Sequence, residues 1–432
     1  MLDLRRIRED PVGVRAALLA RHPALGEALD EVLAKDAQWR SATTAAETLR
    51  AEQREHSERI AAGKRAGADV EPELARMKQL SVEVKARAEQ ARIAEQQLQA
   101  ALALLPNLPD PSAAPGPDDE VLREVGELPE LAFEPRDHLE LAGPLIDTER
   151  AAKLSGSRFA YLKGELVALE LALVSWTLDK LAAHGFEPVI PPVLVRERAL
   201  YGTGFLPDTE QQIYRLADDE LYLLGTSEVA LASLHDGEII DGERLPLRYA
   251  GFSPCFRREA GAAGKDTHGI FRVHQFDKVE MFSFVAPEQS AAEHERILAI
   301  EEEILRELEL PYRVVNIAVG ELGSSAAKKY DCEAWLPSEG RYRELTSCSN
   351  TTDYQARRLN IRLRRAPPGA AEQGGGKRTE VLHTLNGTAV AVGRTIIALL
   401  ENGQRADGSV RLPAALVAHG APTGLDARAP RR

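Results

Sequence analysis

Two neighbouring runs of the sequence carry the side chains best suited to chemistry. The runs span 255–259 and 269–282, and a loop rich in glycine and charge joins them. Arg257 stands near the end of the first run and Arg272 near the start of the second. A guanidinium is a planar, permanently charged fork that suits phosphate oxygens, and Glu259 can receive an amine. The pattern predicts a strand, a loop and a strand that hold a polyphosphate beside an amine, as in an enzyme that joins ATP to an amino acid.

Four further segments place polar groups at the ends of apolar runs. They are 226–228, 343–350, 386–388 and 393–401. In the second, we expect Glu344, Thr346 and Cys348 to share one face of a strand, because side chains alternate along a strand. The last segment predicts a strand that ends near Gly393, followed by an apolar helix with Arg394 in its first turn.

Each polar residue also has a purely structural interpretation. Glu280 is consistent with a solvent-facing strand position, and Arg394 with an ion pair at a helix start. Glu344 could form a salt bridge with Arg341 or Arg343. Taken together, the segments favour a shared site over unrelated ion pairs.

Known glycine-rich phosphate loops are not present in the sequence. A P-loop requires glycine five residues before its Gly–Lys pair and Ser or Thr after it. Around 264–265 those positions hold Glu259 and Asp266, and the pair at 376–377 fails in the same way. A nucleotide is therefore expected to rest on arginines and a sheet.

Composition sets broader limits. The 432 residues allow two or three domains, and the net charge of −13 gives no global attraction to nucleic acid. Cys255, Cys332 and Cys348 show no C-x-x-C spacing, so we expect neither a structural zinc site nor disulfides. The N-terminus lacks an apolar leader, and no run approaches about 18 apolar residues. We expect a cytoplasmic protein that does not enter a membrane.

The segment 27–105 is rich in strong helix formers. Apolar residues recur at spacings of three and four on both sides of a glycine-containing break at 63–69. The spacing predicts two long helices in an antiparallel coiled-coil hairpin. Basic residues lie toward its tip; those expected to contact a phosphate backbone are Arg50, Arg54, Lys64, Arg65, Arg76 and Lys78. The hairpin alone is equally consistent with a dimerisation coiled coil and with an arm that reaches a large ligand.

The remaining chain has a different character. We expect residues 1–105 to form the N-terminal helical arm, 106–136 a proline-rich linker, and 137–420 a globular domain. Within that domain, strand-like runs outnumber regular alternations of strand and helix, which favours an α+β fold on a mainly antiparallel sheet flanked by helices. Residues 365–377 are expected to form a mobile loop, and 421–432 a disordered tail.

These motifs resemble motifs 2 and 3 of the class II aminoacyl-tRNA synthetases. The segments that carry the resemblance are 256–259, 272–276, 226–228 and 393–394, and 191–192 is similar to the end of motif 1. Together with the hairpin, nearly all of residues 1–420 resembles the bacterial seryl-tRNA synthetases. The resemblance implies a class II catalytic domain, activation of L-serine with ATP, and transfer of the seryl group to tRNA for serine. It also admits tRNA for selenocysteine as a second substrate.

The resemblance assigns roles to individual residues. Arg257, Arg272 and Arg394 would stabilise the reacting phosphates. The residues implied in ATP binding are Arg257, Arg258, Glu259, Arg272, Val273, Phe276, Glu344, Leu345, Thr346, Ser347 and Arg394. Glu344 and Ser347 would hold Mg²⁺ with the phosphates. Those implied in serine binding are Thr226, Ser227, Glu228, Glu280 and Thr388.

The resemblance also implies a homodimer and a hairpin that contacts the tRNA. The sequence departs from the common family pattern at Ser227, His268 and Thr351. Two other classes of protein share part of this pattern. One is an amino acid ligase that loads a carrier protein, which would lack a full arm; the other is a coiled-coil adaptor with a decayed domain, which would lose the arginines.

Overall fold

The computed structural model describes residues 1–207, 212–260, 266, 268–365 and 378–427. The chain divides into two compact units, Leu2–Pro106 and Asn107–Arg432. Most of the loop expected over 365–377 lies outside the described residues. Within the described ranges, no helix is both long enough and apolar enough to span a membrane.

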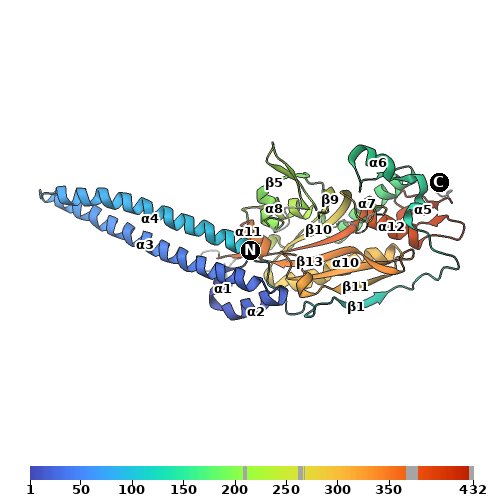
Figure 1. Ribbon diagram of the computed structural model, residues 1–432, viewed down its shortest axis with the longest axis horizontal. Helices are drawn as coiled ribbons and strands as arrows, with labels where there is room; N and C mark the ends of the chain where they lie inside the picture. The colour runs from blue at the N-terminus through green and yellow to red at the C-terminus, as the bar shows by residue number, and fades with distance from the viewer. Residues whose placement is uncertain (208–211, 261–265, 267, 366–377, 428–432) are drawn as a thin grey trace. The chain divides into compact units, whose positions relative to one another are not determined.

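The first unit is built on two long helices. α3 spans Leu25–Arg65 and α4 spans Glu71–Leu104, and they lie side by side as an antiparallel hairpin (Figure 1). Pro72 stands in the first turn of α4, where its missing N–H costs no helical hydrogen bond. Two short helices, α1 (Leu4–Glu9) and α2 (Pro11–Arg21), precede the hairpin.

The interior of the hairpin changes from apolar to polar along its length. Leu29 and Val32 are fully buried near the start of α3. Closer to the tip, the Gln53 amide donates to Ser81 Oγ at 3.1 Å, and His56 pairs with Glu73. These half-buried polar pairs continue the spacing of three and four with side chains that bond across the helix interface.

The second unit is organised around an eight-stranded sheet. Its strand order is β1-β11-β12-β13-β16-β10-β9-β4, and neighbours are antiparallel except β4 and β9. The strands are β1 (Glu120–Val125), β4 (Glu187–Val189), β9 (Leu247–Phe256), β10 (Gln275–Val285), β11 (Tyr312–Asn316), β12 (Lys328–Leu336), β13 (Arg341–Thr352) and β16 (His383–Ala391). The predicted α+β class on a mainly antiparallel sheet is confirmed.

Shorter elements surround this sheet. The helices of this unit are α5 (His138–Ala142), α6 (Thr148–Ser155), α7 (Glu165–Ala183), α8 (Glu197–Thr203), α9 (Glu228–Ala232), α10 (Ser290–Glu307), α11 (Tyr354–Arg358), α12 (Val392–Asn402) and α13 (Ala414–Val417). The minor strands are β2 (Ile146–Asp147), β3 (Tyr161–Leu162), β5 (Leu194–Arg196), β6 (Tyr214–Leu216), β7 (Leu221–Leu223), β8 (Ile239–Asp241), β14 (Arg362–Arg365), β15 (Arg378–Val381), β17 (Val410–Arg411) and β18 (Gly424–Leu425).

The three longest helices of this unit cover one face of the sheet. Buried residues of α7, α10 and α12 join Val279 and Met281 of β10 in one core cluster. Gly387 of β16 lets α10 approach closely, since a Cβ there would lie 2.4 Å from Ile297 Cγ2. Because side chains alternate along a strand, residues 278 and 280 of β10 point to the opposite face, which is left for a binding site.

Two expected boundaries are wrong. The region expected to be a linker contains β1, which pairs with β11 at the edge of the sheet. The side chains of β1 are almost all exposed, so its sequence lacks the apolar alternation that would have revealed a strand. The tail expected to be disordered from residue 421 instead contains β18, which pairs with β17 and buries Leu425; residues 428–432 lie outside the described chain.

Candidate active site

The uncovered face of the sheet holds a cavity of about 490 Å³. Strands β10, β12, β13 and β16, the segment after β9, and the starts of α9 and α12 all contribute to its lining. The sequence-predicted residues that line it are Thr226, Glu228, Arg257, Glu259, Arg272, Val273, Phe276, Glu280, Glu344, Leu345, Thr346, Ser347, Thr388 and Arg394. Segments separated by up to 168 positions, from 226 to 394, therefore meet at one place.

One end of the cavity, which we call the inner end, is a buried network of charged and hydroxyl groups. Lys278 and Glu280 of β10 form an ion pair, with side chains only 7% and 2% exposed. The Lys278 ammonium also donates to Thr226 Oγ1 at 2.8 Å. Thr388 Oγ1 donates to Glu280 Oε2 at 3.3 Å from the neighbouring strand β16. Each group has a fixed partner before any ligand arrives.

Glu228 completes this inner end. Its Oε1 accepts from the Gln355 amide at 2.7 Å and from the Asn386 amide at 3.0 Å. Burial and the nearby charge of Glu280 raise the pKa of Glu228 to about 7. This carboxyl group is consequently poised to gain or lose a proton near neutrality.

A second layer of hydroxyl groups orients Gln355. Its Oε1 accepts from Thr384 Oγ1 at 3.0 Å and from Thr351 Oγ1 at 3.4 Å. The amide oxygen is therefore engaged, and the NH₂ group faces Glu228. Thr351, one of the departures from the family pattern, donates at 2.7 Å to the Thr384 carbonyl and so supports Gln355 chiefly through Thr384.

A second group of lining residues, which we call the outer end, is rich in arginine. Arg257 Nε donates to the Gly225 carbonyl at 3.1 Å, and its guanidinium lies 5.4 Å from the centre of the Phe276 ring. Arg272 Nη1 donates to Glu259 Oε2 at 2.7 Å, and Asp266 lies 3.5 Å from Arg272 Nε. The two carboxylates of this region, Glu259 and Asp266, are thus both partners of Arg272.

Arg394 lies at the same end. Its Nη1 donates to the Glu344 carbonyl at 3.0 Å and lies 3.3 Å from Glu344 Oε2. The guanidinium also rests 4.6 Å from the centre of the Phe271 ring. The arginine is consequently oriented by an aromatic ring and a carboxylate.

A β-bulge in β13 changes which residues face the cavity. The strand register shifts between the pairs Cys332↔Thr346 and Glu333↔Glu344, so Leu345 is an extra residue. Thr346 Oγ1 consequently donates to Glu301 of α10, on the helix-covered face. The expectation that Glu344, Thr346 and Cys348 share one face is wrong, because the bulge places Glu344 on the same face as Ser347.

The electrostatic environment keeps Glu344 ionised. Although burial acts against the charged form, Lys329 and Arg394 lower the pKa of Glu344 to about 2. Its side chain is 41% exposed, so solvent screening weakens these interactions. Ser347, one position beyond Thr346, also lines the cavity beside Glu344.

Two predicted binding residues take other positions. Ser227 is fully buried, and its Oγ donates to the Gly251 carbonyl at 3.3 Å, which fixes the turn that carries Thr226 and Glu228. Arg258 is exposed, and its backbone N–H donates to the Gln212 carbonyl at 2.9 Å. Neither is among the described residues that line the cavity.

Sequence reasoning assigned no role to three contributors to the inner end, Lys278, Gln355 and Asn386, although Lys278 and Asn386 stand in segments that it singled out. Lys278 stands in the strand analysed above, two residues before Glu280, and its period-two spacing could have signalled a shared face. Asn386 likewise stands two residues before Thr388 on β16. Gln355 carried no local signal, because it reaches the site only through the fold.

In the hairpin unit, five of the predicted tRNA contacts are exposed, namely Arg50, Arg54, Lys64, Arg65 and Lys78. Arg76 is half-buried and pairs with Glu52 at 2.7 Å. The unit thus presents basic side chains to solvent along the outer half of the hairpin.

Comparison with known proteins decides the family. The model of the seryl-tRNA synthetase N-terminal domain matches residues 1–109, and that of the tRNA synthetase class II core domain (G, H, P, S and T) matches residues 212–403. The serine–tRNA ligase of Streptomyces coelicolor is 52% identical over 96% of this chain and 96% of its own. The chain belongs to the seryl-tRNA synthetase family. The serine–tRNA ligase of Acidothermus cellulolyticus, also 52% identical, aligns over the whole of both chains.

Solved structures agree with this family membership. The seryl-tRNA synthetase of Pyrococcus horikoshii, solved with ATP, has a TM-score of 0.92 and 41% identity, covering 99% of this chain and 100% of its own. The cytoplasmic serine–tRNA ligase of Naegleria fowleri, solved with AMP, has a TM-score of 0.86 and 30% identity over 99% of each chain. The predicted family and fold, a two-helix arm joined to a class II core, are therefore confirmed.

Proposed function

We propose that this chain is a serine–tRNA ligase that activates L-serine with ATP and transfers the seryl group to the 3′ end of tRNA for serine. The observation that carries the proposal is the cavity with two unlike ends. Buried Glu228, Lys278 and Glu280 occupy the inner end, while Arg257, Arg272 and Arg394 occupy the outer end.

The inner end suits a small hydroxyl amino acid. The buried cation Lys278 is paired with Glu280, so Glu228, when it is ionised, offers its carboxylate to a substrate ammonium. Thr226 and Glu228 would hold that ammonium, and Glu280 would receive the serine hydroxyl. Alanine would leave the buried Glu280 without this partner, so the site would reject it strongly. Thr388 would frame the pocket against larger side chains.

The outer end suits ATP. Arg257 would contact the α-phosphate and Arg272 the outer phosphates, while Phe276 and Arg394 would lie on the two faces of the adenine. Glu259 would accept from the adenine amine. Because Arg272 and Glu259 bond to each other without ligand, ATP would exchange one ion pair for two new contacts.

The residues around Glu344 fit a magnesium ion that arrives with the phosphates. Among the described residues, no cluster of three His, Cys, Asp or Glu side chains suits a protein-only metal site. Mg²⁺ instead commonly takes one or two carboxylates and completes its shell with phosphate and water oxygens. Ionised Glu344 and the Ser347 hydroxyl supply such hard oxygen ligands. Bound there, the ion would neutralise phosphate charge.

The reaction needs no nucleophile from the protein. A serine carboxylate oxygen attacks the α-phosphorus in line, the bond to the bridging oxygen breaks, and pyrophosphate leaves. A ribose hydroxyl of the tRNA end then attacks the seryl carbonyl, and AMP leaves. The chain contributes positioning and charge stabilisation through Arg257, Arg272 and Arg394.

The exposed basic residues of the hairpin would contact the tRNA. Shape-directed recognition of RNA relies on phosphate and 2′-hydroxyl contacts, which flexible Arg and Lys side chains can supply. Because the substrates are cytosolic, we place the enzyme in the cytoplasm.

A homodimer would cover an apolar surface of the second unit. Leu154, Leu171 and Ile190 are 73%, 63% and 83% exposed, and Val167 of α7 is 43% exposed. Contiguous exposed apolar residues commonly mark protein interfaces, and Val167 and Leu171 lie one turn apart on α7.

Charging of purified tRNA for serine with labelled serine tests the proposal. We compare the full chain with a variant carrying Arg50→Glu, Arg54→Glu and Lys78→Glu, while ATP–pyrophosphate exchange monitors activation. We expect both proteins to exchange equally with serine, and charging to fall at least about tenfold in the variant. Robust exchange without charging of any tRNA would favour the carrier ligase instead. A parallel assay with tRNA for selenocysteine tests the second substrate.

A further inference from the structure

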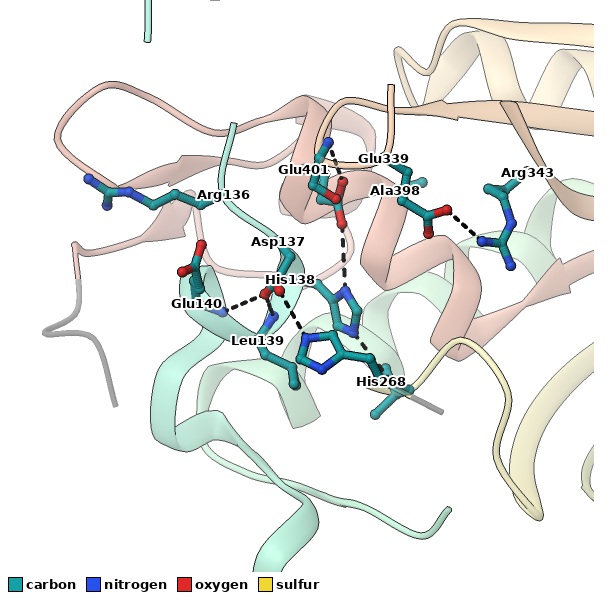
Figure 2. A network of polar contacts seen from close by, with 12 residues as sticks. Arg136, Asp137, His138, Leu139, Glu140, His268, Glu339, Arg343, Ala398 and Glu401 are labelled. Carbon is teal, nitrogen blue, oxygen red and sulfur yellow. Dashed lines mark hydrogen bonds and ion pairs between the residues drawn. The ribbon is translucent and has the colours of Figure 1, made fainter. Parts of the chain in front are cut away.

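A polar network lies beside the ATP end of the cavity, outside the residues assigned to either substrate. It joins the start of α5, the end of α12 and the segment 268–270 that leads back to β10 (Figure 2). Figure 2 shows His138 pointing toward Glu401 of α12, and Asp137 toward His268. None of these side chains lines the cavity.

His138 is the buried centre of this network. Its side chain is 7% exposed, and Nε2 accepts the backbone N–H of Ile270 at 3.2 Å. Because a neutral imidazole has one donor and one acceptor nitrogen, Nδ1 must carry the proton. Nδ1 lies 3.5 Å from Glu401 Oε1, so the carboxylate favours that tautomer and fixes the ring orientation.

Glu401 is itself held in place. Its side chain is 1% exposed, and Oε2 accepts the backbone N–H of Ser338 at 3.1 Å. The carboxylate therefore links α12, which begins two residues before Arg394, to the ring of His138.

The backbone beside His138 is shaped to accept the ring. Gly269 has a φ of +70°, and a Cβ built there would lie 1.8 Å from His138 Nε2. Any side chain at 269 would displace the imidazole or the backbone that it holds. Because Gly269 has no side chain, the ring can approach closely enough to accept the Ile270 N–H.

Beside the buried His138–Ile270 contact, a second pair, Asp137 and His268, lies closer to the surface. Asp137 Oδ1 accepts the backbone N–H groups of Leu139 and Glu140 at 2.8 and 2.9 Å, while Oδ2 pairs with His268 Nε2 at 2.9 Å. Because the His268 side chain is 70% exposed, we expect this pair to contribute little compared with buried His138.

The anchored segment leads directly to groups of the ATP end. The Phe271 ring lies 3.9 Å from the Arg343 guanidinium and 4.6 Å from that of Arg394. The Phe271 carbonyl also accepts from Arg394 Nε at 3.5 Å. Arg272 follows immediately, so a shift of Ile270 would move two of the three arginines assigned to ATP.

We propose that His138, oriented by Glu401, is a positioning residue that sets the place of Phe271, Arg272 and Arg394 for ATP. The inference rests on the proposed function of the cavity and adds residues that touch neither substrate. Its consequence is selective: weaker ATP binding with serine binding preserved.

Three full-length variants test this role. His138→Leu removes both ring nitrogens at similar size, His138→Gln keeps an acceptor oxygen near the position of Nε2, and His268→Ala removes only the exposed pair. We measure KM for ATP and for serine in ATP–pyrophosphate exchange, and ATP affinity by equilibrium dialysis.

We expect His138→Leu to raise KM and Kd for ATP about tenfold, on the scale of a small misplacement, with KM for serine within about twofold. His138→Gln should recover most of the loss, and His268→Ala should change little. Equal increases in both KM values, no change in either, or failure of glutamine to restore ATP binding would overturn the proposal. If His138→Leu does not fold, Glu401→Gln replaces it, with the same selective increase expected and the same contrary results.

The proposed function and this inference fail in different ways. Absence of exchange by the unaltered chain would contradict the proposed function. Dialysis with ATP would still report whether His138 positions the nucleotide-binding residues.

Discussion

The two ends of the cavity hold their charges in different ways. At the inner end, Lys278 and Glu280 are almost completely buried and bond to each other and to neighbouring hydroxyl groups. At the outer end, Arg272 remains 30% exposed and its partners Glu259 and Asp266 lie on the segment that joins β9 to β10. The inner end is fixed by strands β10 and β16, whereas the outer end depends on a connecting segment.

This difference has a functional meaning. A buried network in a low-dielectric setting discriminates strongly, because an unmatched ligand leaves a charged or polar group without a partner. A partly exposed set of ion pairs can exchange partners at modest cost. Serine would therefore be selected by a preorganised pocket, and ATP would be bound by rearranging existing pairs.

The largest effect is expected from Lys278→Met. The substitution leaves Glu280 buried without its cation, a change that typically costs about 3–5 kcal/mol. We expect serine-dependent exchange to fall more than about 100-fold, together with a lower midpoint of thermal unfolding. Lys153→Met removes a surface pair with Glu149, both side chains more than 70% exposed, and serves as a matched control expected to behave as the parent. An active Lys278→Met protein would contradict the preorganised inner end.

Arg257→Ala should have the next largest effect. Arg257 is anchored to Gly225 and would stabilise charge at the α-phosphate, and loss of one such group costs about 100- to 1,000-fold in kcat. Arg257→Lys keeps the charge without the planar fork, so we expect only partial recovery. Single-turnover formation of seryl-adenylate measures the step directly. Full activity in the lysine variant would show that charge alone suffices.

Arg272→Gln should affect ATP selectively. The variant loses contact with the outer phosphates and leaves Glu259 without its cation, while Asp266 keeps its pair with Arg343 at 2.7 Å. We expect KM for ATP to rise about tenfold with little change in KM for serine, since exposed pairs contribute less than buried ones. Initial rates of exchange over a range of both substrates supply the two values. A parallel rise in KM for serine would show that the two ends are coupled.

The smallest expected effect is a dependence of serine binding on pH. In the free enzyme the pKa of Glu228 is about 7, so its carboxylate is charged above this pH and protonated below it. Since only the charged form attracts the serine ammonium, KM for serine should rise as pH falls, approaching tenfold per unit below 7. The profile from pH 6 to 8 should flatten in Glu228→Gln, which also binds serine more weakly. A flat profile in the parent would contradict this role.

The sequence predicted which residues belong to the site better than it predicted how they are arranged. Arg257, Arg272 and Glu280 stood out because charged residues interrupt apolar strands, and the arm followed from helical spacing. Gln355 and Asn386 were given no role because their partner Glu228 comes from another segment, which only register and packing bring near them, whereas the spacing of Lys278 from Glu280 could have revealed Lys278.

The errors have specific physical causes. The face of Glu344 was assigned by strict alternation, and one bulged residue, Leu345, reversed it. Strand β1 went unrecognised because an edge strand with exposed side chains shows no apolar period. Strand β18 was too short to signal itself and forms only through its pairing with β17.

Amino-acid-dependent ATP–pyrophosphate exchange with serine and alanine, in the parent chain and in Glu280→Gln, tests the central claim most directly. The account predicts that the parent prefers serine by about 10⁴-fold or more, because alanine strands the buried Glu280 carboxylate, and that much of this preference is lost in the variant. Comparable exchange with alanine in the parent, or undiminished preference in Glu280→Gln, would contradict it.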